Sequence, residues 1–109
     1  MTKLKIKVKE IRTDDEIDNM LEGDLVEISL YGKMLYNGRS PTDKNTYMFL
    51  YRNINNPNEI IEYHIRRDRL HLEGDSLKVV SNIDYSPKMR KFGKFDFKYR
   101  NVLLKIAGL

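Results

Sequence analysis

Short stretches in which apolar and polar residues alternate, set apart by turn-forming residues, constrain the fold of this chain more than any other feature. The segment that predicts strands most firmly is TYMFLYRNI, followed by NNPN and then by the alternating EIIEYHIRR, together residues 46–67. A period of two is typical of a strand with one buried face. The segment therefore predicts a β-hairpin whose loop is residues 55–58. The residues expected on its inward face are Tyr47, Phe49, Tyr51, Ile61, Tyr63 and Ile65.

Similar patterns predict strands earlier in the chain. KLKIKVKEI (residues 3–11) alternates lysine with apolar residues, and we interpret the lysine row as a solvated face or a protected sheet edge. GDLVEISLYGKMLY (residues 23–36) predicts a second strand with a bend or bulge at Gly32. The next residues, 37–45, contain Asn-Gly and a proline and are predicted to form a loop.

The last third of the chain is also predicted to be β-structure. RLHLEGDSLKVVSNI (residues 69–83) predicts a short strand, a Gly-Asp turn and a further strand. Residues 94–106 predict a terminal strand in which Phe95, Phe97 and Tyr99 face the core. The alternation changes phase near Arg100, as it would at a β-bulge.

One helix is predicted, directly after the first strand. TDDE (residues 13–16) matches a capping box, in which Thr13 and Glu16 satisfy free backbone N–H groups. Gly23 supplies the stop at the other end. The apolar residues expected to dock this short helix on the sheet are Ile17, Met20 and Leu21.

These elements together predict a mainly β single domain, all-β or α+β, over residues 1–109. We expect a small barrel-like antiparallel meander of six to seven strands, with one short helix after the first strand. The order of strand, helix and meander is similar to that of small nucleic-acid-binding barrels such as the Sm-like, SH3-like and OB domains. No motif of a particular family accompanies this likeness.

The composition excludes several kinds of chemistry. The chain has no cysteine and only two histidines, so we expect no disulfide, no metal and no cofactor. It has neither a GxxxxGK[ST] loop nor a GxGxxG motif, so the sequence does not indicate a nucleotide-binding enzyme of the classical kinds. No apolar run reaches the length of a transmembrane helix, so we expect no membrane partner and a cytoplasmic location.

Charge is unevenly distributed around a net value of +4. Residues 10–27 hold eight acidic residues and one basic residue, whereas residues 88–105 hold seven basic residues and one acidic residue. The molecule could carry faces of opposite charge, or the two segments could be neighbours that partly neutralise each other.

The basic segment PKMRKFGKFDFKYRN (residues 87–101) interleaves cations with aromatic residues. Cations bind phosphates and aromatic rings stack on unpaired bases, so this composition favours RNA or single-stranded DNA as a partner. Phe92 precedes the alternating pattern, and we expect it to be the aromatic residue that is free to stack. The candidate nucleic-acid-binding residues are Arg66, Arg67, Arg69, Lys88, Arg90, Lys91, Phe92, Lys94, Lys98 and Arg100.

The sequence therefore favours a non-catalytic binding module, and two alternatives stay open. Seven tyrosines would suit an interface with a protein partner, as in an interaction module or an inhibitor. Glu62, His64 and Arg66 share one predicted strand face, an arrangement compatible with a metal-independent ribonuclease. We rank the ribonuclease last, because a histidine on the polar face of a strand is most often an ordinary surface residue with no catalytic role.

Overall fold

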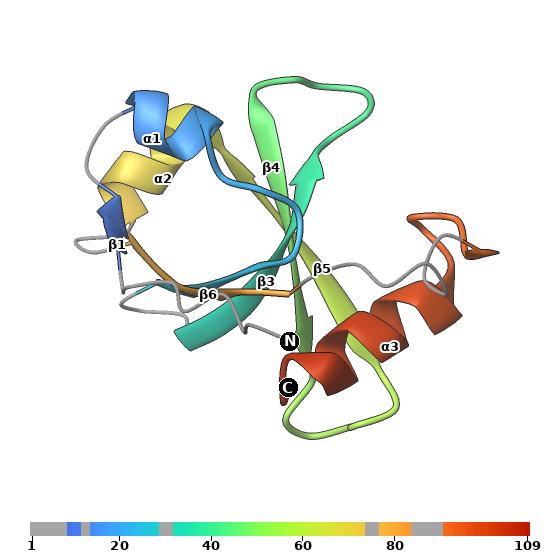
Figure 1. Ribbon diagram of the computed structural model, residues 1–109. Helices are drawn as coiled ribbons and strands as arrows, with labels where there is room; N and C mark the ends of the chain where they lie inside the picture. Colours follow the sequence, from blue (N-terminus) through green and yellow to red (C-terminus); the bar gives the residue numbers. More distant parts are fainter. Residues whose placement is uncertain (1–8, 12–13, 29–31, 74–76, 84–90) are drawn as a thin grey trace, which may run out of the picture.

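The computed structural model describes residues 9–11, 14–28, 32–73, 77–83 and 91–109. In this part of the chain, one six-stranded sheet carries three helices (Figure 1). The strands are β1 (Lys9–Ile11), β2 (Asp24–Ile28), β3 (Gly32–Arg39), β4 (Thr46–Arg52), β5 (Ile60–Arg66) and β6 (Leu77–Asn82). The helices are α1 (Asp14–Asp18), α2 (Arg67–Glu73) and α3 (Phe97–Ile106).

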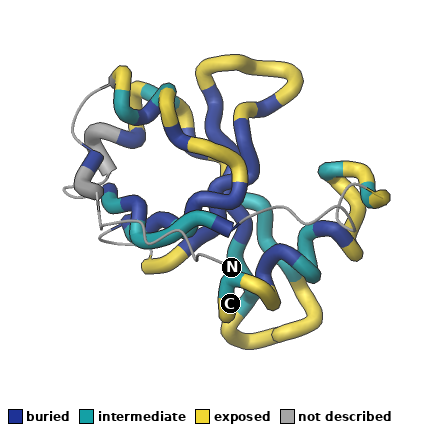
Figure 2. Tube along the Cα trace, in the orientation of Figure 1, coloured by how far each residue is buried: buried dark blue, intermediate teal, exposed yellow. Residues whose placement is uncertain are grey.

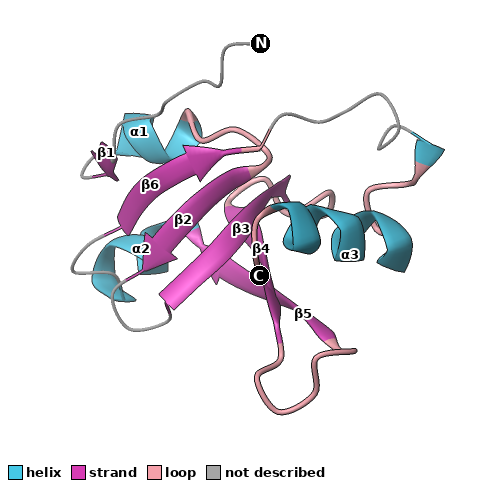
Figure 3. Ribbon diagram, turned by 60° about the horizontal axis from the view of Figure 1, so that its bottom comes forward, coloured by secondary structure: helices cyan, strands magenta, loops and turns pink. Residues whose placement is uncertain are grey.

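The sheet is antiparallel and open. β2, β3, β4 and β5 are neighbours in chain order, β6 returns to pair with β2, and β1 pairs with β6 (Figure 3). The prediction of a mainly β chain with a meander is confirmed. The prediction of a barrel is wrong, because β1 and β5 form the two edges of the sheet. The row of lysines before Lys9 lies outside the described residues.

Apolar side chains from both faces of the sheet form two separate clusters. Helices α1 and α2 close the first cluster, and α3 closes the second on the opposite face, well apart from α1 and α2 in Figures 1 and 3. The first cluster includes Ile17, Val26, Met34, Tyr36, Tyr47, Phe49, Ile65 and Leu70. The second includes Leu35, Leu50, Ile83, Tyr99, Leu103 and Leu104. Central strands β3 and β4 therefore bury consecutive residues rather than alternate ones.

The predicted hairpin is confirmed as β4 and β5. Phe49 lies opposite Tyr63, and both contact the first cluster, as the alternating pattern predicts. The connecting loop spans residues 53–59 and is slightly longer than predicted. Figure 2 shows that this loop and the loop between β3 and β4 are exposed.

Two glycine signals were misinterpreted. Gly32 begins β3, which pairs antiparallel with β2, so residues 23–36 form two strands of a hairpin rather than one bent strand. Asn37-Gly38 lies inside β3 instead of in a turn. There the register with β4 shifts between Tyr36 and Arg39, and Gly38 adopts a φ of 85°. A glycine at positive φ in a strand is typical of a β-bulge.

The predicted first helix is confirmed over a shorter range. Ile17 and Met20 are buried as expected, but Leu21 is 65% exposed. The helix ends at Asp18, so helical spacing no longer applies at Leu21. The proposed cap, Thr13, lies outside the described residues.

The C-terminal part differs most from the prediction. Residues 67–73 form α2 and residues 97–106 form α3, where we predicted strands. Asp96 caps α3, because its side chain accepts a hydrogen bond of 2.7 Å from the Lys98 backbone N–H. Tyr99 and Leu103, four residues apart, are buried on one side of the helix. The change of phase near Arg100 therefore reflects the 3.6-residue period of a helix, and the predicted bulge there is wrong.

Candidate nucleic-acid interface

The structure brings several of the predicted basic residues into ion pairs. Arg66, Arg67, Lys94 and Arg100 lie within 4.0 Å of a carboxylate, on Asp68, Asp18, Glu22 and Glu62 respectively. Of these pairs, Arg66 with Asp68 is the most exposed, so it is the most easily exchanged for a phosphate. Arg69 is an exposed residue of α2, and its backbone N–H donates a hydrogen bond to Asp68 Oδ1. Lys88 and Arg90 lie outside the described residues.

Arg67 belongs to a polar cluster around Asp18. Asp18 Oδ2 accepts a hydrogen bond of 2.8 Å from Arg67, and Asp18 Oδ1 accepts one of 2.5 Å from the Tyr47 hydroxyl. Arg39 lies 3.3 Å from the same carboxylate and stacks over the Tyr47 ring. Burial and the neighbouring Asp18 raise the pKa of Tyr47. These contacts join α1 to α2 and to the sheet, so we assign Arg67 a structural role.

Arg100 belongs to a second cluster, which joins α3 to β5. Its guanidinium lies 2.5 Å from Glu62 Oε2, and the two side chains are each less than a fifth exposed. The other oxygen of Glu62 lies 2.6 Å from His64 Nε2. Arg66, which would hold the phosphate in the ribonuclease hypothesis, instead contacts Asp68. The three residues of that hypothesis are near one another, but Glu62 is engaged with α3.

Lys94 and Phe92 also differ from their predicted roles. Lys94 Nζ lies 2.6 Å from Glu22 Oε1, and this pair covers Gly38, where a Cβ atom would lie only 2.3 Å from Lys94 Nζ. Phe92 is half-buried and packs against the second apolar cluster. The expectation that Phe92 is free to stack is therefore not met.

The side chains that remain available lie on and beside α3. Phe95 and Phe97, which we predicted to be core residues, are 51% and 55% exposed, although the Arg100 guanidinium lies over the Phe95 ring, 5.3 Å from its centroid. Lys98 and Lys105 are exposed, and within the described residues neither makes an ion pair. The exposed Lys91 precedes the helix and is likewise unpaired there. We call Lys91, Phe95, Phe97, Lys98 and Lys105 the α3 surface.

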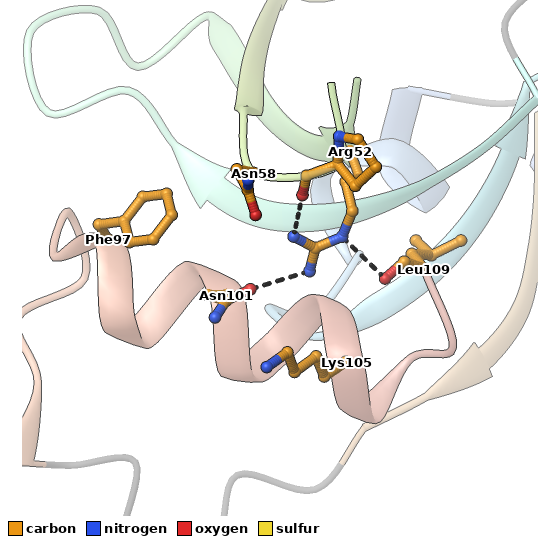
Figure 4. Close-up of a pocket in the computed structure, with 7 residues that line it drawn as sticks. Arg52, Asn58, Phe97, Asn101, Lys105 and Leu109 are labelled. Atoms are coloured by element: carbon orange, nitrogen blue, oxygen red, sulfur yellow. Dashed lines mark hydrogen bonds between the residues drawn. The ribbon is translucent and has the colours of Figure 1, made fainter. Parts of the chain in front are cut away.

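A groove of about 340 Å³ separates α3 from the β4–β5 loop (Figure 4). The helix contributes Phe97, Asn101 and Lys105, spaced by four residues and therefore aligned on one side. The loop contributes Asn58, and Arg52 forms the floor between them. Lys105, Asn58 and Asn101 are not among the residues predicted from sequence to bind nucleic acid. The signal that could have identified this side of α3 was the cap at Asp96 followed by four-residue spacing.

Arg52 holds the walls of the groove together. Its guanidinium donates to the carbonyl oxygens of Pro57 at 2.8 Å and Leu109 at 3.2 Å, and to Asn101 Oδ1 at 3.0 Å. These three bonds connect the loop, the residues after α3 and α3 itself. The groove is thus formed by fixed elements of the fold.

Two further observations concern other classes of site. Among the described residues, no three His, Asp or Glu side chains are grouped closely enough to share a metal ion. None of the described helices has the length and apolar character that crossing a bilayer requires. Comparisons with protein family models, with curated proteins and with solved structures return no match.

Proposed function

We propose that the protein is a small non-catalytic module that binds RNA or single-stranded DNA through the α3 surface. The observation that supports this most strongly is the pairing of exposed aromatic rings with lysines that have no carboxylate partner among the described residues. Aromatic rings stack on unpaired bases of any sequence, and lysines bind the phosphates between them. The cytoplasmic location expected from the sequence stays a prediction.

The proposed interface differs from the one predicted from sequence. It keeps Lys91 and Lys98, adds Phe95, Phe97 and Lys105, and gives structural roles to Arg67, Lys94 and Arg100. Arg66 and Arg69 are on α2 or next to it, away from α3 in Figure 1. If they contact nucleic acid, they do so as a separate site.

The test is binding of labelled single-stranded RNA and single-stranded DNA, followed by fluorescence anisotropy at about 50 and about 200 mM salt. Three lysine–phosphate contacts correspond to a slope of about −2 in log affinity against log salt, or about twentyfold weaker binding over this range. Lys98→Ala should bring the slope closer to zero by about 0.7. The matched control is Lys44→Ala, an exposed lysine in the β3–β4 loop, which should leave the slope unchanged. Absence of binding at the lower salt would contradict the proposal.

A protein partner is the second candidate, because Phe97, Ile106 and the loop residue Ile54 are exposed apolar side chains. The tyrosines that first suggested a protein interface support it less, since Tyr36, Tyr47 and Tyr99 are buried. Apolar contacts of this kind depend little on salt. This candidate would be favoured if the protein bound a purified protein partner, if Lys98→Ala left that binding unchanged, and if Ile106→Ala weakened it.

A further inference from the structure

We propose that the groove between α3 and the β4–β5 loop is a subsite for one unpaired nucleotide of the bound strand. This inference rests on the proposed function and makes it more specific. The base would stack on Phe97, its edge would meet Asn101 and Asn58, and its phosphate would bind Lys105 (Figure 4).

The position of Phe97 supports the stacking step. Its ring stands at one end of the groove, more than half exposed, at the first position of α3. An aromatic ring on a helix has few rotatable bonds, so it can offer its flat face to a base at a small cost in side-chain conformational entropy. Every base has a π-face, so this contact alone favours single strands over duplex without selecting a sequence.

The amide of Asn101 supports the polar step, because its orientation is determined by Arg52. A guanidinium has no acceptor, so the atom of Asn101 that lies 3.0 Å from Arg52 must be the oxygen. The Nδ2 group then points away from Arg52 and offers two donors to a ligand. Asn58 extends toward the groove from the opposite wall (Figure 4), and its side-chain amide has no hydrogen-bond partner in the described structure.

The spacing along α3 fits the dimensions of a nucleotide. A rise of about 1.5 Å per residue separates Phe97, Asn101 and Lys105 by about 6 Å each. Base, sugar and phosphate of one nucleotide can therefore lie along this stripe, with the flexible lysine reaching the phosphate. A volume of about 340 Å³ is at the lower end of small-ligand pockets and suits one nucleotide rather than several.

The experiment measures RNA affinity and its salt slope in two neutral variants, Asn58→Ala and Phe97→Ala. We expect each to weaken binding at least fivefold and to leave the slope unchanged, because neither removes a charge. The matched controls are Asn55→Ala, in the same loop but outside this groove, and Ile54→Ala, which also removes an exposed apolar side chain. Both controls should bind within twofold of the unmodified protein.

The possible outcomes separate this inference from the proposed function. If Lys98→Ala and Phe97→Ala weaken RNA binding while Asn58→Ala has no effect, the nucleotide subsite is wrong and the α3 surface stands. If Phe97→Ala also has no effect, the stacking role of Phe97 is wrong in both proposals. If the protein binds neither RNA nor single-stranded DNA, the proposed function is wrong, and titration with uridine and adenosine monophosphate tests the subsite by itself. Shifts of the Asn58 and Asn101 side-chain amide signals in NMR spectra would then support the subsite alone, and their absence would overturn both proposals.

Discussion

Asn37 is the least satisfied residue of the described structure. It is fully buried in β3, yet neither its Oδ1 nor its Nδ2 atom has a hydrogen-bond partner among the described residues. A buried amide without partners is destabilising, because it loses its hydrogen bonds to water and gains none in return.

We expect Asn37→Leu to raise the free energy of unfolding by about 1 kcal/mol, since leucine has a similar shape and no polar atoms. Urea denaturation measures the change. The matched control is Asn82→Leu, which should lower the free energy of unfolding, because Asn82 Nδ2 donates to the buried Asp24 at 2.6 Å. A loss of stability in both variants would show that Asn37 has a partner in solution.

Tyr36 makes the stability depend on pH above neutrality. Burial raises its pKa to about 12, whereas an unfolded tyrosine has a pKa of about 10. The folded state therefore holds its proton more tightly, so this contribution to stability is complete below pH 10 and is lost between pH 10 and 12. At pH 11 the loss from Tyr36 alone is about 1.4 kcal/mol. Urea denaturation at pH 9 and pH 11 measures the change. The free energy of unfolding should decrease less between these pH values in Tyr36→Phe than in the unmodified protein. An identical decrease in the two proteins would disprove this assignment.

At the scale of elements, α3 is held to the sheet by its apolar side and by the pair of Arg100 with Glu62. The sequence pattern predicts that Arg100 binds a ligand, whereas its low exposure indicates a structural role. The two roles differ in what its removal changes.

We expect Arg100→Ala to lower the free energy of unfolding by about 2 kcal/mol, because it leaves the Glu62 carboxylate poorly exposed and without its cation. The salt slope of RNA binding should stay the same. Lys98→Ala is the opposite case: it should change the slope and alter stability by less than about 0.5 kcal/mol. Unchanged stability together with a shallower slope in Arg100→Ala would restore the role predicted from sequence.

The elements that the sequence predicted correctly are those with one clear period. β5 alternates over its length, and Phe49 and Tyr63 contact the first cluster as predicted, although β4 also buries Met48 and Leu50 on its other face. The segment from Phe95 to Ile106 fits a period of two and a period of 3.6 about equally well, and tertiary packing of Leu103 and Leu104 decides for the helix. The candidate site was only partly predictable for the same reason. Once these residues are helical, Phe97 turns outward and Tyr99 inward, the reverse of a shared strand face.

At the scale of the whole molecule, the acidic and basic segments of the chain are partly neighbours. Glu22 from the acidic segment pairs with Lys94 from the basic one, and Asp18 is neutralised by Arg39 and Arg67. Part of the formal charge of both signs therefore cancels in pairs that bridge elements, and the net charge of +4 is the excess of basic residues that remains. Sequence could not show this, because which carboxylate meets which cation depends on the path of the chain. The unpaired lysines beside α3 then account for the local positive field that a phosphate would meet.

One consequence follows from the loop that forms a wall of the groove. Residues 53–59 lie outside both apolar clusters, and most of them are exposed. The side chains of Asn53 and Asn56 accept hydrogen bonds from the backbone N–H groups of Asn55 and Asn58, so these two residues shape the loop. Arg52 meanwhile fixes the loop through the backbone carbonyl of Pro57. Natural selection can therefore exchange Ile54, Asn55 and Asn58 while the scaffold stays intact, and an engineer could diversify these positions to obtain binders with new ligand preferences.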